Sequence, residues 1–197
     1  MEDAHLARDK KKSRRDRALL IFLDESGFSQ KPSIRRTWGP RGHTPELIHN
    51  FNWKRLSAIG ALICTPGGRW VRLRLRFQEG SVKSPDLVDF LKALRREFPR
   101  PVTLLWDRLP AHKSGPTLDY LNQVYEEGWL ALEWLPPYAP ELNPVEYVWG
   151  HLDGGVMANY APPTLAEIRR RLQKGARRIY PRSYLLKGFL KASGLFF

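Results

Sequence analysis

Residues 18–24 read ALLIFLD, six apolar residues that run directly into an aspartate. An apolar run of this length without alternation is typical of a short strand that is buried on both faces. A charged residue at the carboxyl end of such a strand marks the edge of the sheet where α/β proteins place their chemistry. This stretch predicts a central strand over residues 18–23 and a candidate site at Asp24.

The next part of the chain predicts a hairpin beside this strand. Residues 28–50 are rich in proline and glycine and are expected to form a long loop, and strands are expected over 55–65 and 69–78. Three arginines alternate with the apolar residues of the second of these strands: Arg72, Arg74 and Arg76. They are expected to form a solvated outer face or, alternatively, a phosphate-binding stripe.

The second half of the chain alternates helices with strands. Ser84 and Pro85 are expected at the N-cap and first position of a helix that ends near residue 98. The later elements are expected to be a strand over 102–106, a helix over 114–127, a strand over 130–135, and helices over 144–152 and 164–180. Crossover helices between parallel strands give a mixed five-stranded α/β sheet, with three antiparallel strands followed by parallel strands and helices on its faces. The first strand is then central, beside the fourth.

Charge is the strongest signal in the composition. The 197 residues carry 33 Lys and Arg against 20 Asp and Glu, a net charge of +13, which favours a polyanionic partner and most simply nucleic acid. The excess is concentrated in residues 1–17 and 164–197, at the two ends of the chain. The residues expected to contact DNA are Lys11, Arg14, Arg15, Arg72, Arg74, Arg76, Arg108, Arg170, Arg171 and Arg177.

The length suits one ordinary domain, expected over residues 18–182, with a basic linker or tail at 1–17 and a C-terminal tail at 183–197. A single cysteine, Cys64, excludes an intrachain disulfide and a cysteine-based zinc site. No apolar run approaches the roughly 18–20 residues that span a bilayer, and the charged N-terminus is unlike a signal peptide. A cytoplasmic protein without a membrane partner is expected.

Two buried strands end in aspartates that are expected to be neighbours, Asp24 and Asp107. Like charges a few ångströms apart cannot both ionise cheaply, and a bridging divalent cation is the usual solution. Glu146 is the candidate third ligand, although its spacing from Asn143 also suits a capping pair at the start of a helix. A third carboxylate would complete a two-metal site for phosphoryl transfer.

Asn143 and three further residues are candidates for supporting roles. Glu25 and Glu141 are alternative metal ligands because they lie next to the residues just named. His112, five residues after Asp107, is expected either to orient a carboxylate or contact a phosphate, or to be a structural hydrogen-bond partner.

Four segments resemble the transposases of the Tc/mariner superfamily, in their bacterial insertion-sequence branch. They are LDESGF at 23–28, TWGPRG at 37–42, LWDRLPAH at 105–112 and LPPYAPELNPVE at 135–146. The resemblance implies a ribonuclease-H-like DDE catalytic domain with Asp24, Asp107 and Glu146 as its acidic triad. It also implies that two Mg²⁺ or Mn²⁺ ions are the cofactor, and that the protein cleaves DNA at transposon ends and transfers those ends to target DNA. A homodimer on DNA and a location at the nucleoid are implied as well.

The chain departs from this family in one respect that affects its function. Only 23 residues precede Asp24, too few for the helix-turn-helix region that normally reads the terminal repeats. The chain is therefore expected to be a catalytic half that works with an upstream helix-turn-helix protein or frameshift-fused half, or else a truncated copy or a fragment. Two other functions stay open at this point, a structure-selective ribonuclease-H-like nuclease and an inactive DNA-binding remnant.

Overall fold

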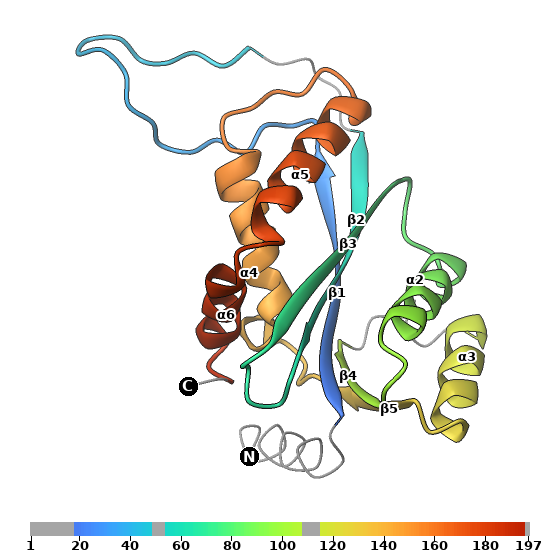
Figure 1. Cartoon of the computed structure of the whole chain (residues 1–197). Coiled ribbons are helices and arrows are strands. Elements are labelled where there is room, and N and C mark those ends of the chain that lie inside the picture. The colour runs from blue at the N-terminus through green and yellow to red at the C-terminus, as the bar shows by residue number, and fades with distance from the viewer. Residues whose placement is uncertain (1–17, 49–53, 108–114, 196–197) are drawn as a thin grey trace.

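The computed structural model describes residues 18–48, 54–107 and 115–195, and its centre is a five-stranded sheet (Figure 1). The strands are β1 (Leu19–Ser29), β2 (Arg55–Cys64), β3 (Val71–Glu79), β4 (Val102–Trp106) and β5 (Leu130–Trp134). Their order across the sheet is β3-β2-β1-β4-β5, and β1 pairs antiparallel with β2 and parallel with β4. The predicted mixed α/β sheet, with the first strand beside the fourth, is confirmed.

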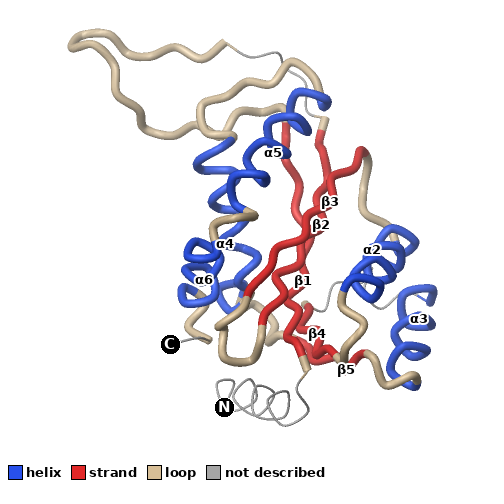
Figure 2. Tube along the Cα trace, in the orientation of Figure 1, coloured by secondary structure: helices blue, strands red, loops and turns tan. Residues whose placement is uncertain are grey.

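Helices cover both faces of the sheet (Figure 2). They are α2 (Ser84–Glu97), α3 (Gly115–Glu126), α4 (Pro144–His151), α5 (Leu165–Ile179) and α6 (Ser183–Ala192). Because side chains alternate along a strand, Leu20 and Phe22 of β1 pack toward α4, α5 and α6, whereas Ile21 and Leu23 pack toward α2 and α3. None of the helices in the described part of the chain is long and apolar enough to cross a bilayer.

Strand β1 is longer than the sequence predicted. It does not end before the aspartate, because its antiparallel pairing with β2 continues as far as Ser29 opposite Arg55. Its parallel pairing with β4 stops earlier, at Phe22 opposite Leu105. Asp24 therefore lies inside a strand and just past the carboxyl end of the parallel part of the sheet.

The three arginines of β3 face the α2 side of the sheet. Arg74 forms an ion pair with Glu97 at the end of α2, and Arg76 donates to a backbone oxygen in the first turn of that helix at 3.3 Å. The guanidinium of Arg72 lies 5.8 Å from the ring centre of Trp70. The stripe is thus held partly against α2, although Arg72 and Arg76 stay exposed.

Helix α2 does not begin as predicted. Its N-cap is Lys83, and Ser84 is the first helical residue. Asp86, in the first turn, accepts a hydrogen bond from the backbone nitrogen of Lys83 at 2.9 Å. The carboxylate thus makes the contact of a capping box that runs from the first turn back to the N-cap backbone, which differs from the contact expected of a serine at the N-cap. Pro85 is tolerated because amides in the first turn of a helix have no partner within the helix.

Residues 183–197 were expected to be a tail, yet helix α6 occupies most of this segment. Leu186, Phe189 and Leu190 are buried in the core that α6 shares with α4 and α5. The hydroxyl of Tyr147 donates to the backbone oxygen of Ala192 at 2.9 Å, which ties the end of α6 to α4. The i, i+3, i+4 spacing of the apolar residues explains the helix, and it makes this segment part of the folded domain.

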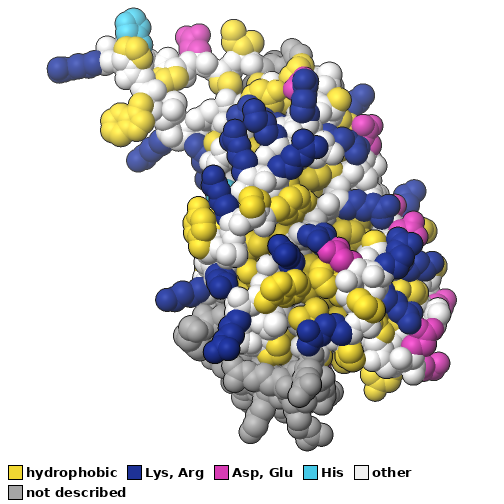
Figure 3. Space-filling model, in the orientation of Figure 1, with side chains coloured by type: hydrophobic (Ala, Val, Ile, Leu, Met, Phe, Trp, Pro, Cys, Tyr) yellow, Lys and Arg dark blue, Asp and Glu magenta, His cyan; other side chains and the backbone are white. Residues whose placement is uncertain are grey.

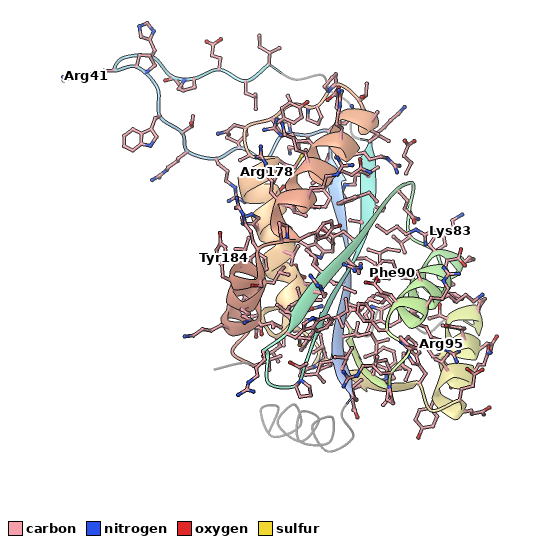
Figure 4. The ribbon with its side chains drawn as sticks, in the orientation of Figure 1. Arg41, Lys83, Phe90, Arg95, Arg178 and Tyr184 are labelled. Atoms are coloured by element: carbon pink, nitrogen blue, oxygen red, sulfur yellow. The ribbon has the colours of Figure 1, made fainter. Side chains whose placement is uncertain are left out.

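After β1, residues 30–48 leave the body of the molecule as a long loop (Figure 1). A loop was predicted over residues 28–50, of which 28 and 29 belong to β1 and 49 and 50 lie outside the described residues. Arg41 lies at the far end of this loop (Figure 4), and Trp38 is 99% exposed. The base of the loop is attached to the body, because the backbone nitrogen of Arg35 donates to Oδ1 of Asn159 at 2.8 Å.

Candidate active site

Three carboxylates line one cavity of about 430 Å³. Asp24 comes from β1, Asp107 follows directly after β4, and Glu146 is the third residue of α4. The loop of residues 135–140 forms much of the remaining wall. The structure thus brings together side chains from three separate segments, the three that were predicted to form the acidic site.

A tryptophan holds Asp24 in place. The strand directs the Asp24 side chain toward the face covered by α4, where it is 7% exposed. The indole Nε1 of Trp149 donates to Oδ2 of Asp24 at 2.9 Å. Gly60 lies opposite Asp24 on β2, and a Cβ atom there would come within 2.6 Å of the Trp149 ring. A glycine on β2 therefore leaves the space that the indole needs to reach the carboxylate.

Asn143 attaches the start of α4 to β1. Its Oδ1 accepts a hydrogen bond from the backbone nitrogen of Val145 at 3.1 Å and so caps the helix. Its Nδ2 donates to the backbone oxygen of Leu23 at 3.1 Å. One buried amide thus fixes the first turn of α4, which carries Glu146, beside the strand that carries Asp24.

Burial and mutual repulsion raise the pKa values of two of the carboxyl groups. Burial above all, followed by the charge of Glu146, raises the pKa of Asp24 from 3.8 to about 8; Glu25 and Asp107 add to this rise, and the hydrogen bond from Trp149 opposes it. Burial and the charge of Asp107 also raise the pKa of Glu146. The carboxyl groups are therefore close enough to repel one another, a repulsion that a cation would relieve.

The donor set suits a hard divalent cation, because Mg²⁺ and Mn²⁺ prefer carboxylate oxygens. Within residues 18–48, 54–107 and 115–195, no three His, Cys, Asp or Glu side chains stand close enough together to form a metal cluster. The three carboxylates fit the ion by charge and by donor type, and the ligand shell is not preformed.

Other residues predicted for the site lie elsewhere. Glu25 and Glu141 are not among the residues that line the cavity. Strand alternation places Glu25 on the α2–α3 face of the sheet, opposite to Asp24. Glu141 is exposed, in the short turn Pro140–Leu142. The remaining predicted residues lie outside the part of the chain that the structure describes: Lys11, Arg14, Arg15, Arg108 and His112.

Sequence reasoning gave no role to Trp149 or Gly60. Trp149 lies three residues after Glu146, and residues at this spacing are neighbours on the surface of a helix. Gly60 interrupts an apolar strand, and a glycine there often marks the close approach of another group. These two signals mark each residue as a candidate for a role, but their contact with each other depends on how α4 packs on the sheet.

Lysine and arginine side chains gather over α5 on the face of the molecule in Figure 3. The exposed cations of this helix, called here the basic face of α5, are Arg170, Arg171, Lys174, Arg177 and Arg178. Arg170 forms an ion pair with Glu167, and Nε of Arg171 donates to the backbone oxygen of Val156 at 2.6 Å. Arg178 lies on the opposite side of the sheet from Lys83 and Arg95 (Figure 4).

Comparisons with known proteins agree with this architecture. The sequence model of the DDE superfamily endonucleases matches residues 19–169. No curated protein sequence matches the chain. The fold is similar to the Mos1 mariner paired-end complex with Mn, with a TM-score of 0.64 and 20% identity over 98% of this chain and 57% of that one. It is also similar to the catalytic domain of Mos1 mariner transposase, with a TM-score of 0.51 and 17% identity over 99% of this chain and 91% of that one.

The range matched by the family model contains all three carboxylates of the cavity and all five strands of the sheet. The chain spans less than two thirds of the transposase in the paired-end complex and most of the isolated catalytic domain. At these sequence identities, the similarity to the solved structures establishes the fold. The chain therefore belongs to the DDE superfamily endonucleases and has the ribonuclease-H-like fold of the mariner transposase catalytic domain.

Proposed function

We propose that the chain is the catalytic domain of an insertion-sequence transposase that cleaves DNA at the ends of its element and joins those ends to target DNA. The observation that carries this proposal is the meeting of Asp24, Asp107 and Glu146 in one cavity of a DDE-family domain. Paired carboxylates that repel one another suit metal-assisted phosphoryl transfer, which needs no covalent enzyme intermediate.

We propose Mg²⁺ or Mn²⁺ as the cofactor, with two ions held by the three carboxylates. When bound, such ions activate a water molecule and stabilise the leaving oxygen of the phosphodiester. The chain itself positions the ligands: Trp149 holds one oxygen of Asp24, and Asn143 fixes the helix that carries Glu146. A related Mos1 complex is described with Mn, which supports the choice of ion.

The proposed substrates are transposon ends and target DNA. Mos1 transposase has been solved as a paired-end complex with a left transposon end, and the net charge of +13 here suits the same kind of ligand. Of the arginines predicted to contact DNA, Arg177 on the basic face of α5 is the best placed, because it is exposed, whereas Arg74 is ion-paired with Glu97 and Arg170 with Glu167. We further propose that the chain works as a homodimer at the nucleoid in the cytoplasm. A helix-turn-helix module, either on a separate chain or joined by frameshifting, would read the terminal repeats.

Asp107→Asn tests the proposal. In a cleavage assay with uncut ends and a strand-transfer assay with pre-cut ends, both with Mg²⁺, this variant is expected to lose cleavage and joining. Its affinity for DNA should be equal or higher, because a charge that repels phosphate is removed. Asp119→Asn makes the same change at an exposed position of α3 and should behave as the wild type.

The outcomes separate the proposal from two other functions. Cleavage without joining by the wild type would indicate a structure-selective nuclease. DNA binding without turnover would indicate an inactive remnant. Unchanged cleavage by Asp107→Asn would contradict the role of the three carboxylates.

A further inference from the structure

Tyr138 combines two unusual properties at the wall of the carboxylate cavity. Its side chain is fully exposed, at 101% of the reference value, and its φ is 60°. Residues other than glycine adopt this left-handed conformation only rarely, and an aromatic side chain there is a clear outlier. Such a conformation persists only where the surrounding structure imposes it, and it is found mostly at functional sites.

The surrounding loop explains how the conformation is held. Three prolines flank the tyrosine and fix their own φ angles: Pro136, Pro137 and Pro140. Before them, the backbone nitrogen of Leu135 donates to the oxygen of Trp106 at 2.8 Å. After them, Nδ2 of Asn143 donates to the backbone oxygen of Leu23 at 3.1 Å. The ring is therefore displayed on a rigid loop that is attached at both ends.

The exposed ring does not stabilise the folded chain by burial. A glycine at position 138 would adopt φ 60° without steric strain. A small polar residue there would expose no aromatic ring to water. The strain and the exposure are both explained if a ligand covers the ring when the cavity is occupied. Because the cavity also holds the three carboxylates, that ligand lies next to the proposed reaction centre.

We propose that Tyr138 is a stacking platform for an unpaired nucleobase beside the phosphate that is cleaved or joined. Every base has a flat face that stacks on an aromatic ring, and a base presents that face only when it is out of the duplex. A ring held on a rigid loop loses little conformational freedom when it stacks. This inference rests on the proposed function, since it needs a DNA strand in the carboxylate cavity.

The test uses a pre-cut DNA end that carries one unpaired 2-aminopurine at its terminus, bound without divalent metal so that no chemistry occurs. Stacking on the wild-type protein and on Tyr138→Phe is expected to change the fluorescence of this base on binding. Tyr138→Gly should abolish the change and weaken binding by about 5- to 150-fold, the range for loss of one stacked base. The melting temperature of Tyr138→Gly should not fall below that of the wild type, since strain is relieved.

Two controls make the result specific. Tyr125→Ala removes another exposed tyrosine, on α3, and should leave binding and fluorescence unchanged. DNA with a fully paired end should bind wild type and Tyr138→Gly equally well. An unchanged fluorescence response in Tyr138→Gly would overturn the inference, as would an equal loss of affinity for paired and unpaired ends.

The proposed function can fail separately from this inference. In one outcome, the wild type shows the fluorescence change, Tyr138→Gly loses it, and no DNA is cleaved or joined with Mg²⁺. This result would support the stacking role and contradict the transposase activity. If the wild type cleaves and joins DNA while Tyr138→Gly keeps the wild-type response, the activity stands and the stacking role falls.

Discussion

The indole of Trp149 makes two contacts that serve one purpose. Its Nε1 donates to Asp24, and its ring occupies the space left by the missing Cβ of Gly60. A buried donor to a carboxylate fixes which oxygen stays free and where it points. At the scale of single residues, the geometry of the site therefore depends on side chains that hold the proposed ligands as well as on the ligands.

Trp149→Phe should weaken Mn²⁺ binding while an aromatic ring remains in place. The expected loss of affinity is about 10- to 100-fold, the range for groups that orient metal ligands. It can be measured by calorimetry or by the spin-resonance signal of free Mn²⁺. Trp129→Phe is the matched control, since that indole donates to the backbone oxygen of Phe98 at 2.8 Å in the other core. Equal Mn²⁺ affinities in the two variants would show that Trp149 only fills space.

Asp24 is expected to make the metal-free protein less stable as pH rises. Its pKa is raised from 3.8 to about 8 on folding, so the folded state holds the proton more tightly than the unfolded state does. The stability from this proton is present in full below pH 4 and is lost as pH rises toward 8. Asp24→Asn, which mimics the protonated form, should raise the melting temperature in EDTA by more at pH 8 than at pH 5. The same gain at both pH values would contradict the shift.

At the scale of elements, prediction succeeded where one segment carries its own signal. The buried apolar runs of β1 and β4 and the alternation of β3 identify strands without reference to the rest of the chain. The end of β1 could not be predicted, because residues 25–29 stay extended through pairing with β2. The contact between Trp149 and Asp24 could not be predicted either, since it depends on how α4 docks on the sheet.

Helix α6 provides a test at this scale of where the domain ends. Leu190 is fully buried, so Leu190→Ala should lower the free energy of unfolding by about 2–5 kcal/mol, measured by urea denaturation. Lys191→Ala, an exposed neighbour in the same helix, should change it by less than about 0.5 kcal/mol. A small effect of both substitutions would mean that residues 183–192 behave as a tail.

At the scale of the whole molecule, the two faces of the sheet differ in how their cations are used. On the α2 side, Arg74 and Arg95 form ion pairs with Glu97 and Glu127. On the α5 side, Arg169 and Arg170 are ion-paired with Glu79 and Glu167, and further cations gather around them (Figure 3). Of these, Lys174, Arg177 and Arg178 are exposed on α5. A group of exposed cations attracts the DNA backbone through release of counterions, so it determines affinity more than it determines sequence preference.

Replacing Lys174, Arg177 and Arg178 together by Gln should weaken DNA binding and flatten its dependence on salt. Each lost phosphate contact is expected to reduce the slope of log affinity against log salt by about 0.9. The same change at Lys83, Lys92 and Arg96 removes an equal charge from the other face and should have a smaller effect. Equal slopes for the two triple variants would show that net charge, and not the basic face of α5, governs binding.

The pairing of β1 on both of its edges affects how the site fluctuates. Amide hydrogens at the centre of a sheet usually exchange with solvent only when the whole domain opens. Strand β1 is paired on both edges as far as Phe22, and the backbone of Asp24, two residues later, stays paired with β2. Glu146 belongs to a helix that is attached to this strand by two side-chain hydrogen bonds, from Asn143 to Leu23 and from Trp149 to Asp24. Local opening should therefore separate the carboxylates by moving α4 and the proline-rich loop, while the strand with the aspartate stays closed.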